Sequence, residues 1–218
     1  MGQVLIYDIS PSINERLKVW PGDIPASREV LCDMQRGDNL TLSALRATVH
    51  LGAHADAPSH YGARAPAIDE RDLRYYLGVC QVMHIAVQPG HRIMPADIKT
   101  PIAAPRVLLA TGTYPDPEQF NEAFASLSPE LIEHMHQAGV ILIGIDTPSV
   151  DPFTSRDLPA HKTFLQHDMA ILEGLILRDV PAGPYELIAL PLKLVGFDAS
   201  PVRAVLRTLA GKGGRRES

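Results

Sequence analysis

The chain has 218 residues, of which 45% are hydrophobic and 21% are charged, a balance typical of a globular domain that can fold without a metal or a disulfide. Its formal net charge of -5 argues against nucleic acid and anionic membranes as partners. No apolar run reaches the roughly 18 residues of a membrane-spanning helix and no secretory leader is recognisable, so we expect a cytoplasmic protein whose two cysteines are free thiols.

The predicted organisation is a single domain over residues 1–210, followed by a flexible tail over residues 211–218. The first β-like run covers residues 4–9. A Pro-Gly turn after it holds the only tryptophan, Trp20, in a loop. Trp20 could form an aromatic wall for a planar substrate or could cover the core, and the residues themselves favour neither.

An alternating run over residues 40–50 predicts a second strand, which leads into the segment 50–60, His-Leu-Gly-Ala-His-Ala-Asp-Ala-Pro-Ser-His. Gly52 and Pro58 indicate that this segment is a loop at the end of the strand. It holds three imidazoles and one carboxylate, at His50, His54, Asp56 and His60. Imidazole is the commonest protein ligand for zinc and similar metals, and a carboxylate can bridge two ions. The segment therefore predicts a metal site.

Three further β-like runs are predicted, over residues 79–87, 106–111 and 140–146. A helix is predicted over residues 128–139, because Ser128 suits the N-cap, Pro129 the first turn and Gly139 the end. The helix leads directly into the apolar run that starts at residue 140. This order indicates an α/β fold with buried strands.

Two residues further along could complete the metal site. Glu173 is set in an apolar run, where a carboxylate is costly to bury unless it is paired or binds a cation. The alternative for Glu173 is the end of a helix, facing water. His161 taken alone is more simply an ordinary loop residue, and the pair His167-Asp168 is a reserve ligand candidate.

The predicted elements end with a strand over residues 185–190 and a helix over residues 201–209, for which Ser200 would be the N-cap. Nineteen prolines and sixteen glycines indicate many loops, and functional sites are commonly built on loops.

The ligand segment resembles the H-x-G-T-H-x-D-x-P-x-H signature of the cyclase-like metal-dependent hydrolases, with Ala53 in place of the threonine. The variant H-x-G-A-H-A-D-A-P, together with Trp20-Pro21-Gly22-Asp23, resembles the bacterial kynurenine formamidases (arylformamidases) of that family. Further matches lie at residues 144–152, 160–161, 171–175 and 185–192. The resemblance implies a swivelling β/β/α fold, in which helices flank a central mixed or barrel-like sheet, and a homodimer.

The resemblance also implies a centre of two divalent metal ions, most often zinc, although manganese, iron or cobalt would suit the same ligands. Carried over position by position, it assigns metal ligands at His50, His54, Asp56, His161 and Glu173. The first three would hold one ion, Asp56 and His161 would hold the other, and Glu173 would contact both. His60 would donate and accept protons, and Trp20 would contact the substrate. By spacing alone, His60 could equally be a further ligand.

The implied reaction is the hydrolysis of N-formyl-L-kynurenine to L-kynurenine and formate, a step of tryptophan breakdown. Three arginines could hold the amino acid end of this substrate, namely Arg46, Arg64 and Arg156. One alternative is hydrolysis of another aryl or cyclic amide, such as isatin, by the same centre. The other is a non-catalytic metal-binding protein, against which a spare proton-transfer group at His60 argues.

Overall fold

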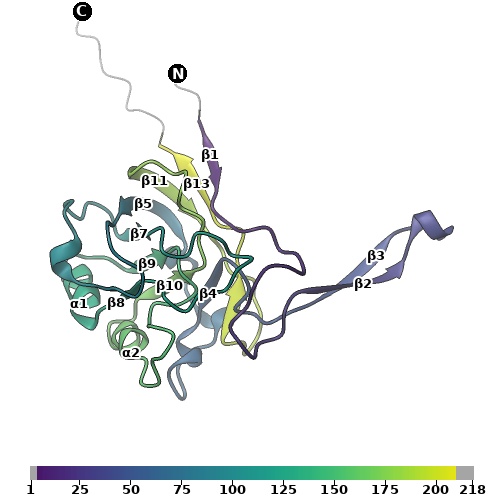
Figure 1. The fold of residues 1–218 in the computed structure, drawn as a ribbon, viewed down its shortest axis with the longest axis horizontal. Coiled ribbons are helices and arrows are strands. Elements are labelled where there is room, and N and C mark those ends of the chain that lie inside the picture. The colour runs from purple at the N-terminus through teal and green to yellow at the C-terminus, as the bar shows by residue number, and fades with distance from the viewer. Residues whose placement is uncertain (1–3, 210–218) are drawn as a thin grey trace, which may run out of the picture.

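A curled mixed sheet of nine strands organises the computed structural model, which describes residues 4–209 (Figure 1). Its strands are β1 (Ile6–Asp8), β4 (His54–Asp56), β5 (Leu77–His84), β7 (Arg106–Ala110), β9 (Leu142–Ile145), β10 (Ala170–Glu173), β11 (Gly183–Ile188), β12 (Ala199–Pro201) and β13 (Val205–Thr208). They are arranged in the order β1-β13-β11-β5-β7-β9-β10-β4-β12. The central strands β5, β7, β9 and β10 are parallel, and the flanking pairs are antiparallel. The predicted α/β class with a central, barrel-like mixed sheet is confirmed.

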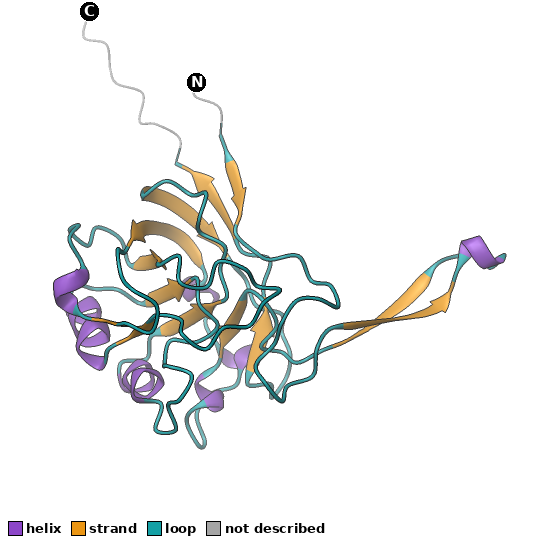
Figure 2. Cartoon of the chain, viewed as in Figure 1, coloured by secondary structure: helices purple, strands orange, loops and turns teal. Residues whose placement is uncertain are grey.

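Two α-helices, α1 (Pro129–Gln137) and α2 (Pro159–Gln166), pack on the same face of the sheet (Figure 2). Their buried side chains join Val107, Ile143 and Ile171 of the parallel strands in one apolar cluster. Leu108 and Leu142 point to the other face and belong to a second cluster. The central strands are thus buried on both faces, as parallel strands usually are. With nine and eight residues, α1 and α2 are too short to span a membrane, as are the other helices among residues 4–209.

The remaining elements are short. They are the strands β2 (Ser27–Cys32), β3 (Leu42–Arg46), β6 (Arg92–Ile93) and β8 (Ser126–Leu127), and the 3-10 helices η1 (Met34–Arg36), η2 (Pro58–His60), η3 (Ile68–Glu70), η4 (Leu73–Tyr75) and η5 (Pro95–Asp97). β2 and β3 form a hairpin that projects from the rest of the structure (Figure 1). The run over residues 40–50 is therefore a strand only in part, and its partner β2 was not predicted.

The capping signals that predicted α1 are used as expected. The Ser128 side chain accepts a hydrogen bond from the backbone N–H of Leu131, Pro129 begins the helix, and Gly139 lies beyond its end with a positive φ of 85°. Each of the six predicted strands overlaps a strand of the structure, although all six end earlier than predicted and β5 and β11 begin two residues earlier. Both cysteines are free, and Cys80 is buried. The tail predicted over residues 211–218 lies outside the described residues.

The helix predicted over residues 201–209 is wrong. Pro201 ends β12, and residues 205–208 form β13, which is hydrogen-bonded to β1 on one side and to β11 on the other. The Ser200 hydroxyl does not cap a helix: it accepts a hydrogen bond from the backbone N–H of Leu192 and donates one to the Pro201 carbonyl. Pairing with two neighbouring strands outweighs the local capping signal, because it satisfies the backbone of this segment on both sides.

Candidate metal centre

The candidate centre lies on the face of the sheet that α2 covers. β4 pairs with β10 in a register that places His54 opposite Glu173. His54 and Asp56 are two residues apart on β4, so both side chains project from this face. α2 supplies His161 from above the same face. Segments far apart in the sequence therefore meet at one point, and Glu173 is a buried strand residue rather than the exposed end of a helix.

The segment over residues 50–60 differs from the predicted loop, because it contains the strand β4 and the 3-10 helix η2. Gly52 supplies the expected bend, with a φ of 59°. Gly174, directly after Glu173, approaches this bend so closely that a Cβ would collide with the carbonyl oxygen of Gly52. Glycine at position 174 thus lets β10 end against the ligand segment.

The two buried carboxylates each face imidazoles on two sides. Asp56 Oδ1 lies 3.0 Å from His50 Nδ1 and 3.4 Å from His54 Nε2, while Oδ2 lies 3.4 Å from His161 Nε2. Glu173 Oε2 lies 3.3 Å from His54 Nε2, and Oε1 lies 3.7 Å from His161 Nε2. Each carboxylate thus directs one oxygen to the side of His54 and the other to the side of His161.

The other nitrogen of each of these imidazoles is held by an acceptor. His54 Nδ1 lies 2.9 Å from the Gly52 carbonyl oxygen, and His161 Nδ1 lies 2.8 Å from Asp151 Oδ2. His50 Nε2 lies 3.0 Å from Asp198 Oδ2. A ring N–H that donates to such an acceptor fixes the ring and leaves the inward nitrogen free to bind a metal.

Asp56 shows that the cluster fits a cation. Both of its carboxylate oxygens are buried, and neither accepts a hydrogen bond of acceptable geometry from any residue in the described range 4–209. The imidazoles lie close enough to attract the negative charge of Asp56, but none of them directs an N–H group at its oxygens. Burying a carboxylate without hydrogen bonds is costly, and a divalent cation would remove that cost. Asp56 belongs to two of the three groups of side chains that could hold an ion.

The pKa values of the cluster also indicate a site that attracts positive charge. Burial by itself lowers the pKa of His54, but Asp56 and Glu173 outweigh burial and raise it to about 10. For His161, Asp151, Asp56 and Glu173 overcome the effect of burial and raise the pKa to about 10. Burial would raise the pKa of Asp56, but the facing imidazoles hold it well below the usual range. The carboxylates therefore attract positive charge strongly, whether it is carried by protons or by metal ions.

His60 lies beside the cluster at the end of η2. Its side chain is 34% exposed, and its Nδ1 lies 3.5 Å from Asp198 Oδ2. Its ring packs on that of His50, with the centroids 4.2 Å apart. His60 occurs in one possible ion-binding group with Asp56 and His161 and in another with His50 and Asp198. The geometry therefore accommodates His60 as a ligand or as a proton carrier.

Asp198 and Asp151 are functional candidates that the sequence reasoning did not single out. Asp198 comes just before β12, which pairs with β4 and so brings this carboxylate to His50. Asp151 accepts hydrogen bonds from the backbone N–H groups of Ala160 and His161 at the start of α2. Neither position carries a local pattern of its own, although Asp151 lies within the matched stretch 144–152.

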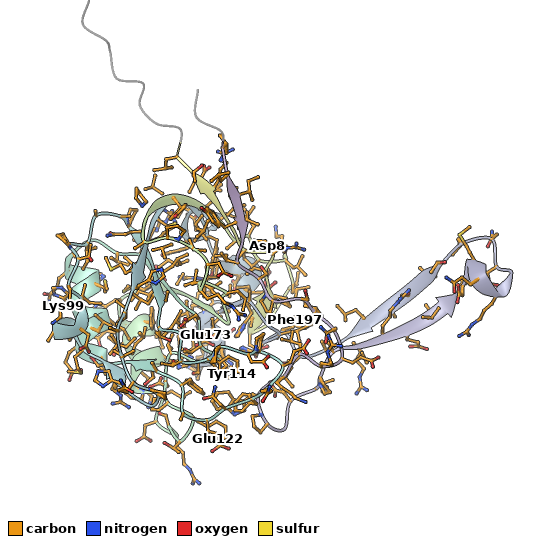
Figure 3. The ribbon with its side chains drawn as sticks, turned by 45° about the horizontal axis from the view of Figure 1, so that its top comes forward. Asp8, Lys99, Tyr114, Glu122, Glu173 and Phe197 are labelled. Atoms are coloured by element: carbon orange, nitrogen blue, oxygen red, sulfur yellow. The ribbon has the colours of Figure 1, made fainter. Side chains whose placement is uncertain are left out.

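A cavity of about 630 Å³ opens onto the cluster. It is lined by four of the histidines and by Glu173, and on the other side by Trp20, Tyr114 and Phe120. Trp20 packs against Phe120 and Phe153, with ring centroids 5.7 Å and 5.0 Å apart. Trp20 thus forms a wall of this cavity. Figure 3 labels Glu173 and Tyr114, which line the cavity together with Phe197.

Other candidates from the sequence lie elsewhere. None of Arg46, Arg64 and Arg156 lines this cavity. Apart from the histidines, Glu173 and Asp198, the charged side chains that line it are Lys18, Asp23 and Asp146. The reserve pair is also apart from the cluster. His167 stacks on His136, and Asp168 accepts hydrogen bonds from Arg71 and Tyr75.

Comparison with known proteins places this architecture in a family. The model of the cyclase family matches residues 7–152, more than half of the chain. A potential metal-dependent hydrolase with cyclase activity is 27% identical, with a TM-score of 0.84 over 95% of this chain and 100% of that chain. A predicted metal-dependent hydrolase from Bacillus stearothermophilus is 28% identical, with a TM-score of 0.81 over the same shares of the two chains.

Isatin hydrolase A from Labrenzia aggregata has the same fold, with a TM-score of 0.82 over 95% of this chain and 94% of that chain, at 22% identity. Because the family model covers most of the sheet and the histidine-rich segment, and because the fold is shared over almost the whole length of these hydrolases, the chain belongs to the cyclase family.

Proposed function

We propose that this protein is an arylformamidase, which hydrolyses N-formyl-L-kynurenine to L-kynurenine and formate with the help of two divalent metal ions. The observation that carries the proposal is the pair of buried carboxylates, Asp56 and Glu173, each of which directs its two oxygens to different imidazoles. Glu173, together with the histidines that face this pair, lines a cavity that has an aromatic wall at Trp20.

In this proposal the ions are held as the family resemblance implies. His50, His54 and Asp56 would hold one ion, Asp56 and His161 would hold the other, and Glu173 would serve both. When bound, the ions, most simply zinc, would lower the pKa of a water molecule and polarise the formyl carbonyl group. The imidazole ligands are oriented by Gly52, Asp151 and Asp198 through their outer nitrogens.

His60 is proposed to move the proton. The leaving group is an aryl amine, which departs poorly as an anion and must therefore gain a proton as the C–N bond breaks. His60 lines the cavity and is partly exposed, so it can exchange protons with solvent between turnovers. Asp198 faces His60 Nδ1, which leaves Nε2 as the atom that carries the proton to the nitrogen of the substrate.

The cavity also suits the rest of this substrate. The aryl ring would stack in the aromatic wall formed by Trp20 and Phe120. Lys18 and Asp23 both line the cavity, and their opposite charges would pair with the carboxylate and the ammonium group of an amino acid. A compact cyclic amide offers neither charge, so this pair favours the formamide.

A second candidate activity is the hydrolysis of isatin, because several chains of similar fold are isatin hydrolases. Isatin is also a planar aryl amide, and the same carboxylates and imidazoles would serve its ring opening. The two activities differ at the charged groups Lys18 and Asp23, which isatin would leave unpaired. A non-catalytic metal-binding role is the remaining alternative.

One experiment separates these possibilities. The purified protein is analysed for bound metals, then incubated with N-formyl-L-kynurenine and with isatin, before and after chelation and after metal is restored. The proposal expects about two ions per chain and metal-dependent loss of the formamide, with isatin turned over more slowly. Preferential turnover of isatin would establish the second candidate, and bound metal without turnover of either compound would establish a binding role.

A further inference from the structure

A long irregular segment forms part of the cavity wall opposite the candidate metal centre. It runs over the fifteen residues 111–125, between the end of β7 at Ala110 and the start of β8 at Ser126, and contains neither helix nor strand. We call it the aromatic segment, because it carries Tyr114 and Phe120, which line the cavity. Compact loops of this length whose ends lie close together are frequently functional. The contacts that fix this segment therefore decide where the aromatic side of the cavity lies.

Asp146, which directly follows β9, holds the start of the aromatic segment. Its Oδ2 accepts hydrogen bonds from the backbone N–H groups of Thr111 and Gly112, each at 2.8 Å. Its Oδ1 accepts a third from the Thr111 hydroxyl at 2.6 Å. Only 8% of Asp146 is exposed. Burial raises the pKa of this carboxyl group, and the donors on Thr111 and Gly112 oppose the shift. Both oxygens of the carboxylate are thus engaged by the aromatic segment.

The hydrogen bonds continue from Thr111 to the other end of the segment. Thr113 Oγ1 lies 2.8 Å from Thr111 Oγ1 and accepts a hydrogen bond from the backbone N–H of Ala125 at 2.9 Å. Because an ionised carboxylate only accepts hydrogen bonds, the hydroxyl proton of Thr111 is directed to Asp146 and that of Thr113 to Thr111. This directional chain of hydrogen bonds joins both ends of the aromatic segment to Asp146.

The aromatic segment also supports the loop that carries Trp20 and Lys18. The backbone N–H of Lys18 donates a hydrogen bond to the Pro117 carbonyl oxygen at 2.9 Å. Trp20 packs edge-on against Phe120, with the ring centroids 5.7 Å apart. A displacement of the aromatic segment would therefore also displace Trp20 and Lys18, which line the same cavity.

We propose that Asp146 is a positioning residue, which fixes the aromatic segment through Thr111 and Thr113 and so sets how tightly the cavity binds the part of the substrate that does not react. The choice of substrate rests on the arylformamidase activity proposed above. Asp146 belongs to none of the groups of side chains in residues 4–209 that could hold an ion, so its effect on turnover passes through the aromatic segment. A wall that is already in place lowers the cost of ordering the site when the substrate binds.

The test uses the full-length, metal-loaded protein and variants of two residues in the chain of hydrogen bonds. Asp146→Asn replaces one acceptor oxygen by a donor, and Thr111→Val removes the hydroxyl but keeps the shape of the side chain. Thr111→Ser keeps the hydroxyl. The control is Thr208→Val, because the Thr208 hydroxyl accepts a hydrogen bond from the Leu5 N–H outside the cavity.

The first readout separates KM from kcat. We expect Asp146→Asn and Thr111→Val to raise the KM for N-formyl-L-kynurenine about tenfold and to leave kcat within about threefold of the wild type, because uniform binding is lost and the chemical step is not. Metal content should not change. Thr111→Ser and Thr208→Val should keep the wild-type KM. A variant that had lost its fold would instead lose kcat and metal.

Trp20 gives a second readout, which does not depend on the substrate. It is the only tryptophan of the chain and it packs against the aromatic segment, so quenching of its fluorescence by acrylamide reports whether the wall is in place. We expect stronger quenching in Asp146→Asn and Thr111→Val than in the wild type. Thr111→Ser and Thr208→Val should be quenched as the wild type is.

The two readouts distinguish failure of this proposal from failure of the arylformamidase proposal. Unchanged quenching of Trp20 in both Asp146→Asn and Thr111→Val would overturn the role of Asp146, whichever compound the wild type hydrolyses. So would an unchanged KM, or a loss of metal with the rise in KM. Turnover of isatin in place of the formamide would end the arylformamidase proposal alone, and the KM for isatin would then decide the role of Asp146. In a wild type without turnover of either compound, the quenching of Trp20 decides it.

Discussion

Three imidazoles of the candidate centre are each fixed by an acceptor at the ring nitrogen that points away from Asp56 and Glu173. For His161 the acceptor is a carboxylate, Asp151, which is itself held by two backbone N–H groups at the start of α2. For His50 it is Asp198, whose side chain is 49% exposed. The orientation of His161 is therefore set by a buried network, whereas that of His50 depends on a half-exposed contact.

Glu173 is the residue whose removal should affect the metal most. Glu173→Ala should reduce the metal content from two ions to one or none, because the remaining second-ion ligands, Asp56 and His161, are too few. It also deprives the Val150 N–H of its acceptor at 2.7 Å. Elemental analysis of the purified variant measures this, with exposed Glu122→Ala as the matched control. Two ions retained per chain would remove Glu173 from the site.

His60→Ala separates a proton carrier from a ligand. We expect near-normal metal content and a rate of formamide hydrolysis about 10²–10⁴-fold lower, which is the usual contribution of a general acid–base group. Turnover and metal content are measured on the same preparation. The control is His91→Ala, since His91 pairs with Asp97 outside the cavity. Parallel loss of metal and activity would instead make His60 a ligand.

Asp198→Ala tests the orientation of His50. Without this acceptor, the ring of His50 is no longer held at Nε2, and we expect metal affinity to fall about 10–100-fold, as is typical when such a partner is lost. Competition with a chelator of known affinity measures the change without reference to activity. Asp198→Glu keeps a carboxylate acceptor and should therefore recover part of the lost metal affinity. Unaltered affinity in Asp198→Ala would show that packing alone orients His50.

At the scale of elements, the centre depends on how β4, β10 and α2 are arranged. β4 has only three residues, and its pairing with β10 on one side and β12 on the other supplies Glu173 and Asp198. α2 follows Leu158, whose φ of 46° turns the chain into the helix. A short turn after α2, with Asp168 at a φ of 49°, then leads into β10.

Asp168 connects this turn to the rest of the body. It accepts hydrogen bonds from Arg71 Nη1 at 2.6 Å and from the Tyr75 hydroxyl at 2.7 Å. Asp168→Ala would leave the guanidinium of Arg71, of which only 6% is exposed, without this partner. We expect a loss of about 1–2 kcal/mol in the free energy of unfolding, moderated by the exposure of Asp168 itself. Denaturant unfolding of the wild type and of Asp168→Ala at neutral pH measures this difference in the free energy of unfolding.

The contribution of Asp168 should also depend on pH. Burial would raise its pKa, but Arg71 and Tyr75 outweigh burial and lower the pKa from its ordinary value of 3.8. A carboxyl group with a lowered folded-state pKa stabilises the protein above the unfolded value and loses this effect as the pH falls through the folded value. The difference between wild type and Asp168→Ala should therefore be constant above about pH 5 and shrink below about pH 4. A difference that grows with acidity would contradict this assignment.

For the molecule as a whole, the proposed metal binding would join three segments of the chain and should therefore stabilise the fold. A ligand present at about 1,000 times its dissociation constant adds about 4 kcal/mol, which for a chain of this size corresponds to a Tm about 8–16 °C higher. Calorimetry of the protein before and after chelation measures the difference. Restored zinc should recover the Tm in the wild type but not fully in Glu173→Ala. An unchanged Tm on complete removal of metal would argue against a centre built across these segments.

Features that are local in origin could be predicted from the order of the amino acids alone. The histidine spacing over residues 50–60 predicted a metal-ligand segment, the capping residues predicted α1, and the apolar run predicted β9 as a buried strand. The helix and the strand are confirmed, because capping and periodicity act over a few neighbouring residues, and the metal-ligand segment stays a prediction. The apolar run around Glu173 made it a candidate ligand, and the family resemblance was needed to add His161 and to give both residues a role.

Which distant groups meet depends on the folded chain. Residues 201–209 carry a helix signal but contribute to the sheet, because the backbone of β13 pairs with β1 on one side and with β11 on the other. Asp198 and Lys18 have no distinguishing pattern, and reach the site only through strand pairing and the shape of the cavity. The partner of β3 was also not predictable, since an alternating run predicts a strand but does not reveal which segment will pair with it. Such contacts are non-local, and their energies depend on the complete packing rather than on any one segment.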